Sequence, residues 1–380
     1  MRFVRLPGSS SRRASTPETV LITGGAGFIG SHLADELLAR GDRVRALDAL
    51  VGQVHSDGPR PPYLNDDVDL RIGDVRDADA VRSALDGVDS VVHLAARVGV
   101  GQSMYELAEY TSANSLGTAV LLQAIAERPV RKLVVASSMS IYGEGLYLDA
   151  QDQPVEPPER TREQLAAHDW DYAGLTPVPT PERKRPGLSS IYALNKYEQE
   201  RACLITGTAY GVPTVALRLF NTYGPRQALS NPYTGVLAIF ASRLLNDRAP
   251  RIFEDGLQRR DFVWVGDVAR AFALALSRDG GDGEAFNIGC GLSVDVREIA
   301  DRLARILDRP IEPEITGESR VGDIRHCFAD ISLARETLRY RPTVELDEGM
   351  HLLGEWLAGQ VAEDRVEDAA AELARRGLSL

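Results

Sequence analysis

A tyrosine and a lysine stand four residues apart in the stretch Tyr192-Ala-Leu-Asn-Lys196, and Ser138 follows an apolar run earlier in the chain. On a helix this spacing places the phenol and the ammonium on one face. An unperturbed tyrosine, with a pKa of about 10, is a poor base near neutrality. A lysine ammonium beside the phenolate supplies roughly 3–4 kcal/mol at an effective dielectric of about 20, so we expect it to lower the tyrosine pKa by about two to three units before desolvation opposes it.

Such a trio can exchange a proton with a substrate hydroxyl while a hydride moves, with Ser138 hydrogen-bonded to the reacting oxygen. Tyr-x-x-x-Lys is also common on exposed helix faces, so the surrounding sequence has to show whether this pair is catalytic. Ser138 lies where a predicted strand over 132–137 ends, and Tyr192 begins a strong helical pattern over 190–210. We therefore predict Ser138, Tyr192 and Lys196 as the catalytic residues.

A glycine-rich turn near the start of the chain supplies the second chemical signal. An apolar run over 20–22 leads into Gly24, Gly27 and Gly30, and leucines then recur at helical spacing. Strand, glycine turn and helix start are the context of a dinucleotide-binding fingerprint, in which a pyrophosphate sits at the helix N-terminus. Asp48 ends the next apolar run, at the distance expected for an acid that binds the adenosine ribose. This acid would repel a 2′-phosphate, so the pattern favours NAD over NADP.

Two further strand ends are candidates for cofactor contact. Asp74 follows a predicted strand over 69–72; it could bond the adenine amine, and it could equally cap the next helix. The stretch 90–96 (SVVHLAA) predicts a strand that ends in the small residues Ala95 and Ala96, where a cofactor could pass close to the chain. We interpret His93 in this strand as a packed residue and not as a catalytic one.

Strands alternate with helices through the first half, which predicts an α/β fold with a doubly wound parallel sheet of Rossmann type. Shorter mixed elements in the second half predict a smaller C-terminal α/β lobe that binds substrate. The segment 149–188 carries seven prolines and few helical signals, and is expected to be an insertion. The predicted division is a disordered tail (1–17), a dinucleotide-binding domain (18–220), a substrate-binding lobe that partly returns to the first domain (221–360) and a peripheral helix (361–380).

Composition excludes several classes of partner. The net charge of −12 argues against nucleic acid and anionic membranes, which both attract positive surfaces. No apolar run approaches the ~20 residues of a membrane span. Three cysteines, Cys203, Cys290 and Cys327, show no metal-binding spacing, so we expect reduced thiols, no metal and a cytoplasmic location.

Six motifs, GGAGFIGSH, HLAA, ASSMSIYGEG, YALNK, RLFNTYGPRQ and RRDFVWVGDV, together resemble those of the extended short-chain dehydrogenases/reductases in the nucleotide-sugar epimerase/dehydratase family. The resemblance runs from Thr19 to about Trp356 and implies the Ser138, Tyr192 and Lys196 triad with NAD as cofactor. The cofactor-binding residues that it implies are Gly24, Gly27, Phe28, Ile29, Asp48, Asp74, Val75, Leu94, Ala95, Ala96, Tyr192 and Lys196. The residues that it implies for a nucleotide-diphosphate sugar are Ser138, Met139, Ser140, Asn221, Arg260 and Arg320.

Departures from the family pattern narrow the reaction. Family dehydratases place an acid pair directly after the catalytic serine or threonine, where this chain has Met139 and Ser140. Elimination and decarboxylation are therefore disfavoured, and 4-epimerisation through a 4-keto sugar remains the simplest reaction. The ASSMSIYGEGLY and QALSNPYTGV stretches are most similar to those of 4-epimerases that act on dTDP-L-rhamnose, a dTDP-6-deoxyhexose. A UDP-hexose or UDP-uronate 4-epimerase is the alternative, followed by a dehydratase and a non-catalytic NAD-sensing protein.

Two expectations concern parts of the chain outside the catalytic residues. Family resemblance and apolar surface on the helices 105–127 and 190–210 predict a homodimer with an isologous contact. The insertion 149–188 joins two catalytic residues and carries the apolar side chains Trp170, Tyr172 and Leu175. We expect it to lie over the sugar pocket as a lid, with a surface excursion packed on the second lobe as the alternative.

Overall fold

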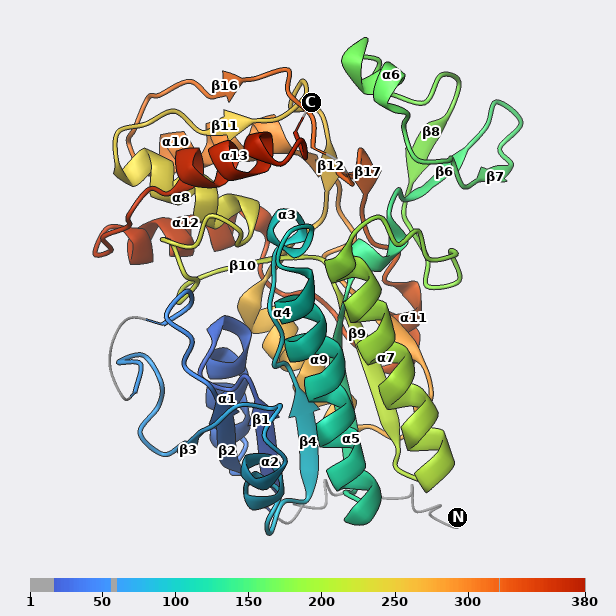
Figure 1. Ribbon diagram of the computed structural model, residues 1–380, viewed down its shortest axis with the longest axis vertical. Helices are drawn as coiled ribbons and strands as arrows, with labels where there is room; N and C mark the ends of the chain where they lie inside the picture. Colours follow the sequence, from blue (N-terminus) through green and yellow to red (C-terminus); the bar gives the residue numbers. More distant parts are fainter. Residues whose placement is uncertain (1–16, 56–59, 321, 380) are drawn as a thin grey trace, which may run out of the picture.

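The computed structural model describes residues 17–55, 60–320 and 322–379, so the tail predicted over 1–17 falls outside the described residues except for Pro17. Its centre is a seven-stranded parallel sheet in the order β14-β9-β5-β4-β1-β2-β3 (Figure 1). The strands are β1 (Thr19–Thr23), β2 (Arg43–Asp48), β3 (Asp69–Ile72), β4 (Ser90–His93), β5 (Lys132–Ser138), β9 (Thr214–Leu219) and β14 (Ala285–Ile288). The predicted Rossmann-type fold is confirmed.

The strand order reverses between β1 and β4, because β2 and β3 lie on one side of β1 while β4 and β5 lie on the other. Residues Thr23 and His93 pair across this point, and Ser138 pairs with Leu219 at the end of β5. In open parallel sheets, ligands bind beyond the carboxyl ends of the strands at such a reversal. Topology alone therefore directs a ligand to the end of β1.

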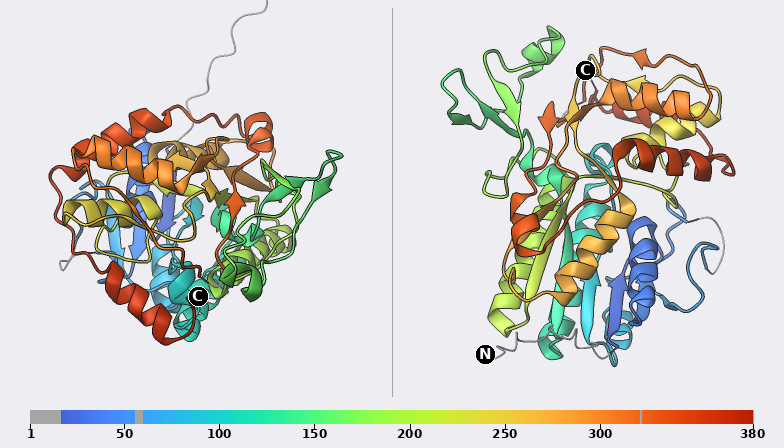
Figure 2. Two further views of the ribbon diagram at one scale, coloured as in Figure 1. Left: turned by 90° about the horizontal axis from the view of Figure 1, so that it is seen from above. Right: turned by 180° about the vertical axis from the view of Figure 1, so that it is seen from behind.

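Helices cover both faces of the sheet. On one face α1 (Phe28–Ala39) and α9 (Val265–Ser277) share a core with Ile22, Val134 and Phe286. On the other face the helices are α2 (Ala78–Ala84), α4 (Leu107–Thr111), α5 (Gly117–Glu127) and α7 (Ile191–Tyr210), with a π-helical turn, η1 (Ser112–Leu116), between α4 and α5. Figure 2 shows α1 and α9 from behind. The Ser190 hydroxyl caps α7, and Gly211 ends it with a left-handed φ of 67°.

A smaller lobe lies above the carboxyl ends of the sheet strands (Figure 1). Its core joins Phe240, Leu303 and Leu353. The helices are α8 (Val236–Leu245), α10 (Val296–Ile306) and α12 (Leu346–Leu357), with α11 (Ser332–Thr337) returning to β14. Short strand pairs complete it: β10 (Asn221–Tyr223) with β13 (Phe262–Trp264), β11 (Arg251–Ile252) with β16 (Glu314–Ile315), and β12 (Arg259–Arg260) between β15 (Val294–Asp295) and β17 (His326–Cys327). The last helix, α13 (Val366–Arg375), follows α12.

The insertion forms a small subdomain that projects from the upper side of the molecule (Figure 1). Its strands β7 (Pro154–Val155) and β8 (Thr176–Val178) each pair antiparallel with β6 (Leu146–Leu148), which directly precedes the insertion. Its helix α6 (Arg162–Ala166) starts with a capping box between Thr161 and Gln164. In the described ranges, no helix combines the length and the apolar character needed to cross a bilayer.

Candidate active site

One continuous cavity lies between the carboxyl ends of the strands and the second lobe, and every residue predicted to hold cofactor or substrate lines it. The structure thus brings together positions as distant in sequence as Gly24 and Arg320. The individual roles of these residues remain predictions. The catalytic candidates also line this cavity, with Ser138 at the end of β5 and Tyr192 in the first turn of α7.

Tyr192 is held by contacts to both neighbouring elements. Its backbone N–H donates to Ser103 Oγ at 3.0 Å, which ties α7 to the short helix α3 (Val100–Ser103). Burial raises the pKa of the Tyr192 phenol to about 12, and a hydrogen bond with Ser138 opposes the increase. Ser138 Oγ in turn accepts hydrogen bonds from the backbone N–H and the hydroxyl of Ser140, at 3.1 and 3.0 Å. The serine oxygen is therefore fixed beside the phenol.

Lys196 is buried one helical turn from Tyr192, and desolvation lowers the pKa of its ammonium to about 8. Its Nζ donates to Gln199 Oε1 at 2.8 Å, and Gln199 Nε2 donates to Thr118 Oγ1 at 2.8 Å. The expectation that Lys196 would lower the tyrosine pKa is wrong for this structure. Desolvation dominates at both groups, and the ammonium is bound to Gln199.

The glycine turn between β1 and α1 has the geometry of an anion site. Gly24 adopts φ 71°, and a Cβ there would lie 2.9 Å from the backbone nitrogen of Ala95. A Cβ on Gly30 would lie 2.4 Å from the Gly24 carbonyl oxygen, so only glycine lets α1 approach the turn this closely. Gly27 precedes the first residue of α1, whose free N–H groups can receive a pyrophosphate.

Asp48 ends β2 and Asp74 follows β3 by two residues, but the two acids differ in their partners. Asp48 accepts backbone hydrogen bonds from Ala26 at 3.0 Å and Leu50 at 2.9 Å, which fix the carboxylate beside the glycine turn. Asp74 forms an ion pair with Arg76 at 2.6 Å, and this arginine lowers the pKa of the carboxyl. Asp48 therefore fits the predicted ribose contact, while Asp74 is engaged by its own neighbour.

The two arginines predicted to bind the diphosphate line the part of the cavity that the second lobe forms. Desolvation lowers the pKa of the half-buried Arg260 guanidinium, which donates to the Arg259 and Arg325 carbonyl oxygens, both at 2.9 Å. Arg320 pairs with Asp323 at 2.9 Å and lies over the Phe253 ring, 4.3 Å from its centroid. Asn221 Oδ1 is buried and has no hydrogen-bond partner among the described residues. A diphosphate and a nucleoside supply the groups that such side chains bind.

His93 is packed in the interior, as the sequence analysis interpreted it. Its Nδ1 lies 2.7 Å from Thr23 Oγ1 and its Nε2 lies 2.9 Å from Thr118 Oγ1. Burial lowers the pKa of this histidine to about 3, so the ring is neutral near pH 7.

The insertion does not form the expected lid. No residue of 149–188, all of which the structure describes, lines the cavity. Its apolar side chains are covered elsewhere: Trp170 is buried and stacks on His168, and Tyr172 packs edge-on against Tyr147. The alternative, a surface excursion packed on the second lobe, describes the structure.

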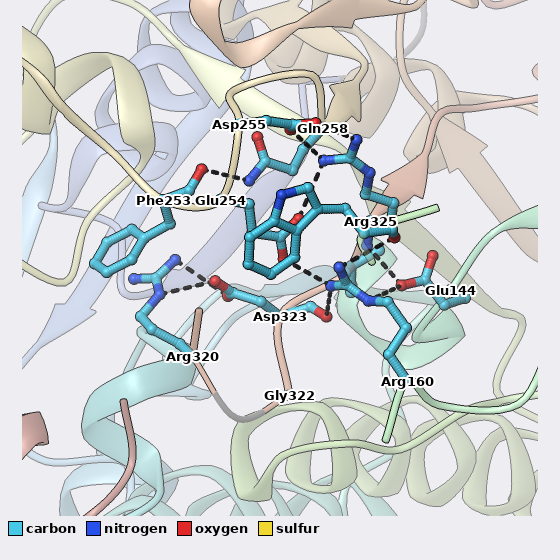
Figure 3. A network of polar contacts seen from close by, with 12 residues as sticks. Glu144, Arg160, Phe253, Glu254, Asp255, Gln258, Arg320, Gly322, Asp323 and Arg325 are labelled. Carbon is cyan, nitrogen blue, oxygen red and sulfur yellow. Dashed lines mark hydrogen bonds and ion pairs between the residues drawn. The ribbon is translucent and has the colours of Figure 1, made fainter. Parts of the chain in front are cut away.

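Buried ion pairs fasten the insertion to that lobe (Figure 3). Arg160 Nη2 lies 2.8 Å from a Glu254 carboxylate oxygen and donates to the Asp323 carbonyl oxygen at 3.1 Å. Arg325 lies 2.6 Å from Asp255 and 2.8 Å from Asp171. These contacts hold the segment that carries Arg320, so the insertion supports the cavity wall from outside.

Sequence reasoning missed one part of the cavity. The final helix α13, expected only as a peripheral helix, contributes Val366, Ala369, Ala370 and Leu373 to the lining. Their spacing of i, i+3, i+4 and i+7 forms one apolar stripe and was available in the sequence. What the sequence did not show was the surface that this stripe faces.

Sheet topology, glycine turn and the Ser138, Tyr192 and Lys196 trio together define a Rossmann-type, dinucleotide-dependent enzyme. The family model described as "NAD dependent epimerase/dehydratase family" matches residues 20–168 and 171–289. The chain belongs to this family; it is an NAD-dependent nucleotide-sugar epimerase, and NAD is its cofactor.

Individual relatives agree with this assignment. A dTDP-L-rhamnose 4-epimerase from Burkholderia thailandensis is 35% identical over 347 residues, which cover 90% of this chain and 95% of the relative. The crystal structure of UDP-glucose 4-epimerase with UDP-glucose from Thermotoga maritima matches with a TM-score of 0.74 at 31% identity, covering 90% of this chain and 98% of that one. UDP-glucose 4-epimerase from Thermus thermophilus, in complex with NAD, matches with a TM-score of 0.72 at 32% identity, covering 90% and 100%.

Proposed function

We propose that this protein is a 4-epimerase of a dTDP-6-deoxyhexose such as dTDP-L-rhamnose. The observation that carries the reaction type is the set of acids in the cavity. Four acidic side chains line it in the described part of the chain, and Met139 and Ser140 occupy the positions after Ser138. Each of the four is engaged by backbone N–H groups or arginine: Asp48, Asp74, Glu109 and Asp323. Loss of water needs a free acid and base at the sugar, whereas epimerisation does not.

The chain's own residues handle the proton. Tyr192, hydrogen-bonded to Ser138, takes the proton of the 4-hydroxyl as the sugar becomes a 4-keto sugar, and gives it back when the 4-hydroxyl re-forms. Ser138 orients the reacting oxygen, and its hydrogen bond with Tyr192 favours the phenolate. Lys196, held by Gln199 one turn away on α7, keeps a buried positive charge in the lining of the same cavity. The glycine turn and Asp48 would hold NAD, which would supply a hydride acceptor for carbon 4 and allow the hydride to return to the opposite face of the sugar.

Binding residues divide between the two ends of the cavity. We assign the glycine turn, Phe28, Ile29, Asp48, Val75, Leu94, Ala95 and Ala96 to the cofactor, with Asp74 as a weaker candidate. Arg260 and Arg320 would hold the diphosphate, and Asn221 would present its free oxygen to a substrate hydroxyl. The preference for a dTDP-6-deoxyhexose is supported by the Burkholderia relative, and a UDP-hexose, as in the Thermotoga structure, is the alternative.

We further propose that two copies of the chain form a homodimer. Four large apolar side chains are exposed on the η1 and α7 surface: Leu116 at 53%, Leu194 at 44%, Ile205 at 59% and Tyr210 at 56%. An isologous contact would cover this surface in both copies at once. A cytoplasmic location fits the three free cysteines.

Product analysis tests this function. The purified enzyme with bound NAD is incubated with dTDP-L-rhamnose, dTDP-glucose, UDP-glucose and UDP-glucuronate, and products are analysed by mass spectrometry and NMR. We expect a product of unchanged mass, inverted only at carbon 4, formed fastest from the dTDP-6-deoxyhexose. A mass loss of 18 or 44 Da, for water or carbon dioxide, would exclude epimerisation as the main reaction.

A further inference from the structure

The C-terminal segment crosses from the second lobe to the first domain. On the side of the lobe, Asp364 pairs with Arg243 of α8 at 3.4 Å and with Arg248 at 3.1 Å. The Asn246 side chain donates to the Ala362 carbonyl oxygen at 2.8 Å. These contacts fix the chain directly before α13 begins.

On the side of the first domain, α13 reaches α3. A Cβ on Gly101 would lie 3.4 Å from Leu373 Cδ1, so the leucine packs against the backbone of α3. The Arg376 guanidinium lies 4.5 Å from the centroid of the Tyr105 ring. Beyond the helix, Ser379 forms an antiparallel backbone bridge with Arg320.

The helix turns its apolar side toward the cavity. Val366, Ala369, Ala370 and Leu373 line it, whereas Ala371 and Ala374 on the outer side are exposed. Ala369 and Leu373 are 8% and 6% exposed, yet neither belongs to the three hydrophobic cores of the described chain. Both side chains therefore contribute to the wall of the cavity and not to the packing of one of these cores.

Leu373 is linked to the catalytic candidate Tyr192 through α3. It contacts Gly101, and Ser103, two residues further on in the same short helix, binds the backbone of Tyr192. We propose that α13 is part of the substrate site and that Leu373 is a specificity-determining residue that contacts the sugar. The proposal rests on the proposed function and deepens it: an apolar side chain here favours the methyl group of a 6-deoxyhexose over a hydroxymethyl group or a carboxylate, which would lose hydrogen bonds to water.

Substrate discrimination tests the role of Leu373. Relative kcat/KM for dTDP-L-rhamnose and dTDP-glucose is measured for wild type, for Leu373→Ser and for Ala371→Ser, a matched control on the exposed side of α13. We expect the preference for the 6-deoxy sugar to fall about tenfold in Leu373→Ser, the scale of a small apolar contact in a pocket, and to stay unchanged in the control. An unchanged preference in Leu373→Ser would overturn the proposal.

Hydrogen exchange separates this proposal from the reaction itself. In the full-length protein with NAD, we expect saturating dTDP-L-rhamnose to slow amide exchange in 366–378. If only UDP-glucose binds, the assignment of a dTDP-sugar is wrong. The same exchange measurement with UDP-glucose then still tests whether α13 contacts the substrate. Unchanged exchange in 366–378 while calorimetry shows binding would contradict a substrate contact.

Removal of α13 gives a second test. A chain shortened to end at Arg365 should keep its affinity for NAD and raise the KM for the sugar nucleotide about tenfold or more. An unchanged KM would contradict a substrate contact by α13.

Discussion

Lys196 Nζ lies 2.8 Å from Gln199 Oε1, so the glutamine amide one turn along α7 stabilises the ammonium of the catalytic candidate. Burial lowers the pKa of Lys196 to about 8, and the amide oxygen opposes the loss of the proton. If the charged lysine is the active form, activity falls as pH rises through the lysine pKa. The pH at which activity is lost then depends on the hydrogen bond between Lys196 and Gln199.

Two substitutions at Gln199 should move the alkaline limb of the pH–activity profile in opposite directions. Gln199→Met removes the acceptor, so we expect the limb of kcat/KM to shift to lower pH. Gln199→Glu places a carboxylate beside the ammonium and should shift it to higher pH. Steady-state profiles of the NAD-bound enzyme between pH 6 and 10 measure both shifts. A limb that stays in place in both variants would show that Lys196 does not control it.

Removal of the Tyr192 hydroxyl tests the proposed proton exchange. Tyr192→Phe should keep NAD and the nucleotide sugar bound but lower kcat by at least about a hundredfold, the usual scale for a general base. Single-turnover rates and calorimetric titration separate the two effects. Near-normal turnover in this variant would remove Tyr192 from the mechanism.

The buried His93 ring should make the protein sensitive to acid. Its pKa is lowered to about 3 in the folded state, so below pH 6.5 the unfolded chain takes up a proton that the folded chain does not. The free energy of unfolding therefore falls as pH falls, by about 2 kcal/mol between pH 7 and pH 5 from this group. His93→Gln should lose this part of the pH dependence in urea titrations at both pH values. If the free energy of unfolding falls by the same amount between pH 7 and pH 5 in the variant and in wild type, His93 is protonated when the protein is folded.

The insertion should act on stability more than on catalysis. Arg160→Met removes one of the two buried arginines that pair with Glu254, while Arg325 stays 3.1 Å from this carboxylate. Breaking a buried pair costs about 3–5 kcal/mol of unfolding free energy, and because Arg325 remains we expect a loss near the lower end of this range. The double variant Arg160→Met/Glu254→Gln should recover part of that loss because the carboxylate that lost Arg160 no longer carries a charge. Urea titration measures the free energy of unfolding of the single and the double variant. We expect the fold-change in kcat/KM to be smaller than the fold-change in the folding equilibrium constant. A single variant as stable as wild type would show that the ion pair has no structural role.

Much of this site could be predicted because its signals are local. A strand followed by glycines at Gly24, Gly27 and Gly30 requires one backbone path, and a helix fixes the relation of Tyr192 to Lys196. The sequence also predicted that Ser138 and Arg320 belong to the site, because their motifs lie at a strand end and in a loop. The broad fold and the members of the site were therefore available before the structure.

Tertiary packing decided the features that sequence reasoning missed. The prolines and aromatic residues of 149–188 predicted a covering loop, but they could not show that Arg160 pairs with Glu254, ninety-four positions later. The apolar stripe of α13 was visible in the sequence, but its contact with Gly101 depends on the position of α3 in the folded chain. The pKa of Tyr192 depends on desolvation, which spacing does not report.

Epimerisation of dTDP-L-rhamnose in deuterium oxide tests the central claim most directly. If the hydride leaves carbon 4 and returns to carbon 4, the product carries no solvent deuterium on carbon and no net NADH accumulates. We predict a 4-epimer of unchanged carbon-bound hydrogen content by NMR and mass spectrometry. Deuterium at carbon 3 or carbon 5, or NADH formed in proportion to product, would contradict transient oxidation at carbon 4.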